Sequence, residues 1–327
     1  MEFRTLHYFE AIKHPIDYTS NLLSIGSCFA SYMGNNLEKR KFSIYSNPSG
    51  IIFNPMSIAQ TIEDCLPLNA HLEEDSVFEY LGSWHSWNHH GSFSKASQLE
   101  LLASIDQANQ WGHAALRNST HLIITWGSAY VYEKYTDRKI VANCHKVPAK
   151  EFTKRLLEPI EIIQRYVELI KSIRAINPSI NIVWSISPVK HIRDGLHENN
   201  LSKSVLFLAM HELLKHDKQS YYFPAFELVQ DELRDYRFYK EDMAHPSEQA
   251  VNYVWESFIS HCLSAEAKET MLQIEEIHQA MNHIPLRPNS EAHHSFRSNF
   301  HKKVLALKLK HPRINLKQEE DYFSQNI

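Results

Sequence analysis

The sequence lacks a long hydrophobic run anywhere along its 327 residues. No stretch approaches the roughly 18 apolar residues that a membrane-spanning helix needs. The first 20 residues carry charges at Glu2, Arg4 and Glu10, where a signal peptide would be continuously apolar. Cysteine is scarce as well, and no CxxC pair occurs among the four residues Cys28, Cys65, Cys144 and Cys262. We therefore expect no membrane partner and no export, and free thiols in a reducing cytoplasm.

Charge of either sign is not in excess. Lys and Arg number 34 and Asp and Glu 38, for a formal net charge of -4, so the chain lacks the basic field that drives non-specific nucleic-acid binding. Aromatic residues are plentiful, with 16 Phe, 15 Tyr and 6 Trp, which predicts a folded chain and excludes disorder. The composition indicates no nucleic-acid partner, predicts no cofactor and leaves the oligomeric state open.

Short apolar runs bounded by turn residues alternate with amphipathic helical stretches, which is the pattern of an α/β fold. The runs that predict strands are 22–25, 42–45, 121–126, 180–186 and 221–226. Unbroken runs of this kind are typical of parallel strands whose two faces are covered by helices. The sequence thus predicts a three-layer α/β/α sandwich with a parallel sheet of about five strands.

Apolar residues spaced three and four apart predict the helices between these strands. The predicted helices are 29–37, a long one from Phe152 that Pro178 ends, 201–215 with Asn199 or Asn200 as its cap, and 247–262. Beyond about residue 264 the strand runs stop and polar helical stretches follow. We therefore divide the chain into a main domain, 1–264, with an insertion at about 66–118, and a helical C-terminal extension, 265–327.

The segment Gly26-Ser27-Cys28-Phe29-Ala30 stands between the first predicted strand and the first predicted helix. Ligands of open α/β sheets bind at the carboxyl ends of the strands. At that place the positive end of the helix dipole favours a thiolate, and the N–H groups of the first turn could hold an oxyanion. Cys28 is therefore a candidate nucleophile. The alternative is that Cys28 is a small buried residue and Ser27 caps the helix.

Asp242 precedes His245 by three residues, in a turn just before the predicted helix 247–262. A carboxylate in this position can curl back to hold one imidazole nitrogen, leaving the other nitrogen for a nucleophile across the cleft. The alternative is a surface acid and a histidine that merely precede the helix cap, Ser247.

The segment Asn143-Cys144-His145-Lys146 follows the third predicted strand after a short polar excursion. Asn143 could donate to an oxyanion, and His145 or Lys146 could bind an anionic substrate group. An inert loop fits the same spacing.

The segment Trp84–Ser94, WHSWNHHGSFS, mixes aromatic and polar side chains around Gly91 and predicts a loop over a pocket. His85 and His89 would ligate a metal together only if they lay on a helix. We predict no metal site.

Taken together, these segments resemble the GSCFA family, which is named for the pentapeptide that stands here at Gly26–Ala30. The resemblance covers roughly residues 1–265. Further segments typical of that family are NPSGIIFNP at 47–55, TWGSAYVY at 125–132, NCHK at 143–146, SPVKHIRDG at 187–195 and LRDYRFYKEDMAHPS at 233–247. GSCFA proteins are in turn similar to SGNH (GDSL-like) hydrolases, so the resemblance implies an SGNH hydrolase-like fold.

SGNH hydrolases carry a serine nucleophile in a Gly-Asp-Ser motif after the first strand, and a late Asp-x-x-His motif supplies the acid and base. The resemblance places Cys28 at that serine, with Ser27 as the runner-up nucleophile one residue earlier. Asp242 and His245 match the final motif.

The oxyanion hole of that superfamily is less well matched. Gly50 corresponds to its oxyanion glycine, but the block that reads GxND there is Gly127-Ser128-Ala129 here and lacks the asparagine. Gly127, Asn143 or Asn54 would then have to help hold the oxyanion, because a missing donor costs roughly a hundredfold in rate.

The sequence thus predicts an SGNH-like acyl ester hydrolase or acyltransferase, in which Cys28 attacks, His245 moves the proton and Asp242 orients His245. The resemblance implies a small-molecule or carbohydrate ester as substrate. The predicted substrate-binding residues are His90, His145, Lys146, Asn54 and Lys190. The alternative is a non-catalytic binding protein that keeps the fold and uses this cleft to hold an anionic small ligand.

Overall fold

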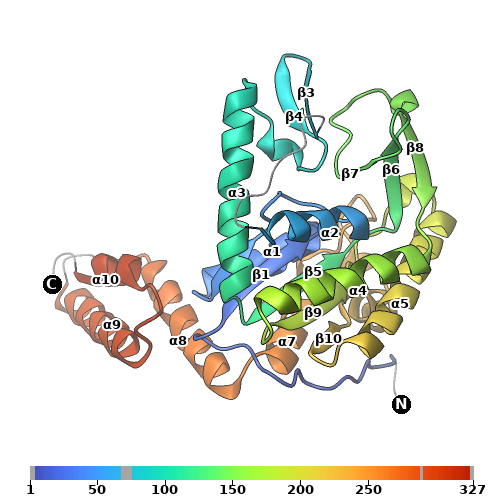
Figure 1. Cartoon of the computed structure of the whole chain (residues 1–327). Coiled ribbons are helices and arrows are strands. Elements are labelled where there is room, and N and C mark those ends of the chain that lie inside the picture. Colours follow the sequence, from blue (N-terminus) through green and yellow to red (C-terminus); the bar gives the residue numbers. More distant parts are fainter. Residues whose placement is uncertain (1–3, 68–75, 288–289, 325–327) are drawn as a thin grey trace.

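The computed structural model describes residues 4–67, 76–287 and 290–324 (Figure 1). Its centre is a parallel sheet of five strands in the order β10-β9-β5-β1-β2. The strands are β1 (Asn21–Gly26), β2 (Ser43–Ser46), β5 (His121–Trp126), β9 (Asn181–Ile186) and β10 (Ser220–Phe223). The predicted strand runs are confirmed, except that the last one ends at Phe223 and the short helix α6 (Ala225–Glu227) follows it.

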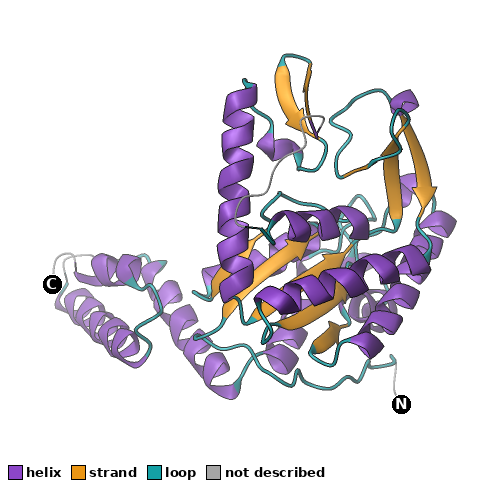
Figure 2. Ribbon diagram, in the orientation of Figure 1, coloured by secondary structure: helices purple, strands orange, loops and turns teal. Residues whose placement is uncertain are grey.

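Helices cover both faces of this sheet, so the predicted three-layer α/β/α sandwich is confirmed (Figure 2). One face packs its apolar side chains against α1 (Cys28–Lys39) and α7 (Glu248–Cys262). The other packs against α2 (Pro55–Asp64), α4 (Pro159–Ile176) and α5 (Leu196–His216). Alternate residues of each strand point to opposite faces: Leu22 of β1 belongs to the first core, and Leu23 to the second.

The loop after β2 is tied to the junction of β1 and α1. The side chain of Asn47 accepts a hydrogen bond from the Gly26 N–H at 2.8 Å and donates one to Ser31 Oγ at 2.8 Å. The N–H of Ile52 donates to the Gly26 carbonyl at 3.2 Å. Segment 47–52 is therefore fixed beside the carboxyl end of β1.

Two antiparallel units rise on one side of the central sheet (Figure 1). The first is the hairpin of β3 (Val77–Tyr80) and β4 (Ser83–Ser86), followed by the 3-10 turn η2 (Gly91–Phe93) and the long helix α3 (Gln98–Asn118). The second is a three-stranded sheet of β6 (Tyr130–Lys134), β7 (Ile140–Val141) and β8 (Phe152–Leu156), with β6 in the middle.

Two helix predictions and one loop prediction need correction. The helix predicted from Phe152 begins only at Pro159, because 152–156 pairs with β6 as strand β8. Helix α5 begins at Leu196 after Gly195, so Asn199 and Asn200 lie inside the helix and do not cap it. The segment predicted as a loop over a pocket, 84–94, contains part of strand β4 and the 3-10 turn η2. By contrast, the predicted cap of α7 is confirmed, since Ser247 Oγ accepts the Ala250 N–H at 3.3 Å.

The C-terminal part is helical, as predicted, with α8 (Ala265–Met281), α9 (Glu291–Lys310) and α10 (Lys317–Ser324) at the lower left of Figure 1. Buried residues of these helices, such as Ile274 and Phe323, belong to the same apolar cluster as α1 and α7. Across the described residues, no helix has both the length and the apolar character for crossing a membrane.

Candidate active site

The carboxyl ends of three neighbouring strands form the edge where the candidate residues lie. Gly26 of β1 is paired with Thr125 of β5, and Thr125 with Ser185 of β9. The residues that continue these strands, Cys28 and Gly127 among them, therefore leave the sheet at similar height. This edge is where open α/β sheets bind ligands.

Cys28 is the first residue of α1, and its side chain is exposed. Ser27 is buried, its Oγ has no hydrogen-bond partner among the residues that the structure describes, and it accepts no bond from the first turn. The first helical bond runs from the Ser31 N–H to the Ser27 carbonyl at 3.1 Å. The N–H groups of Cys28 and its two successors thus have no acceptor within the helix. Of the two candidate nucleophiles, only Cys28 reaches the surface.

The other three thiols have different surroundings. Cys65 and Cys262 are buried, and burial raises the pKa of Cys65 to about 12 and that of Cys262 further. Cys144 is partly buried, which raises its pKa to about 11. All four cysteines lie in the described part of the chain, and Cys28 is the exposed one.

Asp242 and His245 form the compact pair that their spacing predicts. His245 Nδ1 donates to Asp242 Oδ2 at 2.6 Å, while Oδ1 accepts the N–H groups of Ala244 and His245, each at 2.9 Å. These backbone bonds, with the imidazole bond after them, hold the pKa of Asp242 well below its usual value. The carboxylate therefore fixes the imidazole through Nδ1 and leaves Nε2 for another partner. The His245 side chain is 43% exposed.

The Asp242–His245 turn is joined to the loop that follows β9. The N–H of Lys190 donates to the Ala244 carbonyl at 3.0 Å. His191, the next residue, is carried by the same loop, and its N–H donates to Asn199 Oδ1 at 2.9 Å. Since β5 lies between β9 and β1, the loop after β9 and the β1–α1 junction that carries Cys28 follow the two strands that flank β5.

The two predicted oxyanion glycines have their N–H groups occupied. The Gly50 N–H donates to the Asn47 carbonyl at 2.9 Å, and the Gly127 N–H donates to the Phe53 carbonyl at 2.7 Å. A Cβ on Gly50 would lie 2.4 Å from the Cβ of His90, and one on Gly127 would lie 2.8 Å from that of Phe53. Both glycines are thus needed for close packing, and neither amide is free to hold an oxyanion in this structure.

The two candidate asparagines also serve local structure. Asn54 caps α2: its Oδ1 accepts the Ser57 N–H at 2.8 Å and its Nδ2 donates to Ser57 Oγ at 2.9 Å. Asn143 Oδ1 accepts the His145 N–H at 2.8 Å. Both the oxygen and the nitrogen of the Asn54 amide are therefore engaged in hydrogen bonds, and so is the oxygen of the Asn143 amide.

The remaining predicted substrate-binding residues lie on different loops of the chain. His90 packs on Gly50 and so reaches the rim beside β1. His145 is buried and donates from Nε2 to the Ser86 carbonyl at 2.7 Å. The Lys190 ammonium lies 4.1 Å from the ring centroid of Tyr239, and Lys146 is exposed. No cluster of three potential metal ligands occurs within the described residues, and His85, in strand β4, bonds Ser94 and Tyr80 through its ring nitrogens.

Sequence reasoning missed two residues at this edge, Lys203 and His191. Lys203 is buried in α5 and its ammonium donates to the carbonyls of Gly127 at 2.6 Å and Ser187 at 2.7 Å. It joins the loops that follow β5 and β9, and burial lowers its pKa to about 7. One feature of the sequence could have indicated that Lys203 is buried. It lies three residues before Leu206, on the apolar face of α5.

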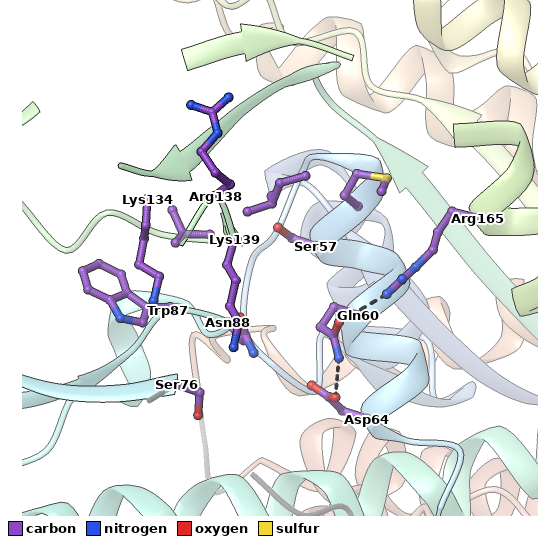
Figure 3. Close-up of a pocket in the computed structure, with 13 residues that line it drawn as sticks. Ser57, Gln60, Asp64, Ser76, Trp87, Asn88, Lys134, Arg138, Lys139 and Arg165 are labelled. Carbon is purple, nitrogen blue, oxygen red and sulfur yellow. Dashed lines mark hydrogen bonds between the residues drawn. The ribbon is translucent and has the colours of Figure 1, made fainter. Parts of the chain in front are cut away.

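A separate pocket of about 470 Å³ lies beside α2 (Figure 3). Its wall includes Gln60 and Asp64 of α2, Trp87 after β4 and basic residues of the β6–β7 hairpin and α4. Ion pairs in this wall join Lys134 to Asp137, Arg138 to Glu133, and Arg165 to Glu63. Among the described residues, neither Cys28 nor His245 lines this pocket.

Comparisons with known proteins bear on the whole chain. A family model described as the GSCFA family matches residues 21–258, and one described as the GSCFA domain protein, C-terminal domain, matches residues 274–327. Curated proteins show no match. The chain is similar to a Streptococcus pneumonia structure described provisionally as a platelet activating factor, with 13% identity and a TM-score of 0.39 over 74% of this chain and 84% of that one. It is also similar to an acetyl xylan esterase from the rumen bacterium Butyrivibrio proteoclasticus, with 10% identity and a TM-score of 0.36 over 76% of this chain and 64% of that one.

Proposed function

We propose that this chain, which belongs to the GSCFA family, is an enzyme that transfers acyl groups through a thioester on Cys28. The observation that carries the proposal is the place of this thiol. It is exposed at the first turn of α1, where the helix N–H groups have no capping side chain. The positive end of the helix stabilises the oxyanion that attack by this sulfur produces.

The Asp242–His245 pair supplies the proton transfer. His245 Nε2 takes the thiol proton as Sγ attacks the ester carbonyl, whose π electrons move to oxygen and form a tetrahedral oxyanion. When the oxyanion collapses, the bond to the alcohol breaks, and the imidazolium returns its proton to the leaving oxygen. The Cys28 thioester then passes its acyl group to water or to a second alcohol. Asp242 keeps His245 in the tautomer that accepts at Nε2.

The substrate class is proposed from the resemblance alone. The superfamily similarity implies a small O-acyl group, carried on a carbohydrate or another small molecule. Hydrolysis and acyl transfer share the thioester and differ only in the final acceptor.

The test is acetylation by p-nitrophenyl acetate followed by mass spectrometry of the peptides. We expect one acetyl group on Cys28, none in Cys28→Ala, and an unchanged adduct in Cys144→Ala, which removes the partly buried thiol. His245→Ala should form the adduct more slowly by about 100-fold, the usual contribution of a general base. Equal labelling of Cys28 and Cys144, or no adduct on Cys28, would refute the proposal.

A further inference from the structure

The proposed reaction needs hydrogen-bond donors for the oxyanion beyond the first turn of α1. The superfamily pattern assigns this task to a glycine amide and an asparagine. Here the amides of Gly50 and Gly127 are engaged and the asparagine is replaced by Ala129. A further donor at the carboxyl end of β5 would complete the site, and the loop after β9 brings a side chain to that place.

His191 lies directly beside Gly127. Its Nε2 is 3.5 Å from the position that a Cβ on Gly127 would occupy, and its ring centroid is 5.2 Å from that of Phe53. Gly26 is paired with Thr125 at the carboxyl ends of the neighbouring strands β1 and β5, and Cys28 and Gly127 each follow two residues later, Cys28 as the first residue of α1. An acyl group on Cys28 would therefore lie at the same edge of the sheet as this imidazole.

The backbone around His191 is held firmly. Its N–H donates at 2.9 Å to Oδ1 of Asn199, a buried residue of α5. One turn further along α5, Lys203 binds the carbonyls of Gly127 and Ser187. The same face of α5 thus fixes both Gly127 and the segment that carries His191, and a fixed donor needs no reorganisation when charge develops.

The charges that face His191 keep its ring neutral. Burial, Lys203, His245 and Lys154 lower its pKa to about 4, and only Asp194, which is paired with Lys154, opposes them. A neutral imidazole can donate an N–H to an oxyanion, as neutral histidines elsewhere donate to carbonyl oxygens. Within the described part of the chain, neither ring nitrogen of His191 has a hydrogen-bond partner, so the N–H is available.

We propose that the imidazole of His191 donates from Nε2 to the carbonyl oxygen of the acyl group on Cys28. This role rests on the proposed thioester chemistry and adds His191 to its catalytic residues. The third donor position of the superfamily is then filled from the loop after β9 and not from the loop after β5.

Two reagents separate this role from a structural one. p-Nitrophenyl acetate reacts with Cys28 through a tetrahedral oxyanion, whereas iodoacetamide alkylates the thiol by displacement and forms none. In His191→Phe, which keeps a ring but removes the donor, acetylation should slow by about 100-fold while alkylation is unchanged. His191→Gln, which retains an N–H donor, should recover part of the loss. His197→Phe, at an exposed histidine on α5, should leave both rates unchanged.

Each outcome has one meaning. If His191→Phe is acetylated as fast as wild type, or if its acetylation and alkylation slow equally, His191 is not an oxyanion donor. Neither result contradicts the proposed thioester on Cys28. If wild type itself gains no acetyl group on Cys28, the thioester proposal is wrong and the role of His191 is refuted with it. Loss of the fold would show as iodoacetamide labelling of Cys65 and Cys262, which are buried in the native chain. His191→Gln is then the deciding variant: with these two thiols protected, acetylation at the His191→Phe rate would refute the proposal.

Discussion

Asp242 makes its hydrogen bonds through two different oxygens, and this division allows the role of its charge to be tested. Oδ1 accepts the two backbone N–H groups that close the turn, and Oδ2 accepts His245 Nδ1. In Asp242→Asn the oxygen can keep the turn, but the amide NH2 faces Nδ1 and forces the other tautomer. We expect acetylation of Cys28 to fall by about 100-fold or more, measured as p-nitrophenol release in a single turnover.

A matched control lies seven residues earlier in the same segment. Asp235 accepts the Arg237 N–H at 2.9 Å in a turn of the same kind but holds no histidine. Asp235→Asn should therefore leave acetylation unchanged. Equal rates in wild type and Asp242→Asn would show that the carboxylate does not orient the base.

The residues that could be predicted are those whose partners are close in sequence. Asp242 and His245 are three apart, and their contact follows from the turn alone. The contact of His191 with Gly127 and the bonds of Lys203 to two loops depend on how three strands and a helix meet, which no local spacing indicates. Lys190 was selected in the segment SPVKHIRDG, while its neighbour His191 is the residue that faces Gly127.

Among the elements, strands buried on both faces were predictable and half-exposed strands were not. β5 is buried at every position, so it reads as one apolar run. β8 is only partly buried, and its apolar residues happen to continue the helical spacing of α4. The pairing of β8 with β6 decides its conformation, and pairing partners 18 to 26 residues away leave no local pattern.

A buried histidine, His89, follows the hairpin of β3 and β4, and its burial disfavours the protonated imidazole. His89 is 0% exposed, its Nδ1 bonds Ser86 Oγ at 2.8 Å, and its Nε2 has no partner within residues 4–67, 76–287 and 290–324. Burial, and then neighbouring His145, lowers the pKa of His89 to about 4. The unfolded chain binds the proton near pH 6.5, so the stability linked to His89 is complete above that pH and is lost as the pH falls towards 4.

We therefore expect the free energy of unfolding to fall by about 2 kcal/mol between pH 7 and pH 5 on account of His89 alone. Urea unfolding at both pH values measures the loss, and His89→Phe should remove this part of it. His294→Phe, at an exposed histidine of α9, should retain the full loss. A pH dependence that is the same in His89→Phe and wild type would show that His89 does not titrate in the unfolding transition.

The whole molecule has an apolar cluster that extends from the sheet into the C-terminal helices. Leu22 of β1, Phe258 of α7 and Ile274 of α8 are all part of it. Ion pairs cross the same boundary, with Arg40 bonded to Glu275 and Lys41 to Glu319, each at 2.7 Å. The change in sequence character near residue 264 predicts two units, but the shared core predicts that they unfold together, since neither can lose its packing without exposing the other.

A substitution in α8 tests this coupling, because the six tryptophans all lie between residues 84 and 255 and their fluorescence reports only on the main domain. Ile274 is 0% exposed, and Ile274→Ala should lower the free energy of unfolding by about 3 kcal/mol. If the core is shared, urea transitions followed by tryptophan fluorescence and by far-UV circular dichroism should shift equally. Leu272→Ala, at a side chain 62% exposed on the same helix, should change stability by less than about 0.5 kcal/mol. An early loss of helical signal in Ile274→Ala, with the fluorescence transition unmoved, would mean that the C-terminal helices unfold on their own.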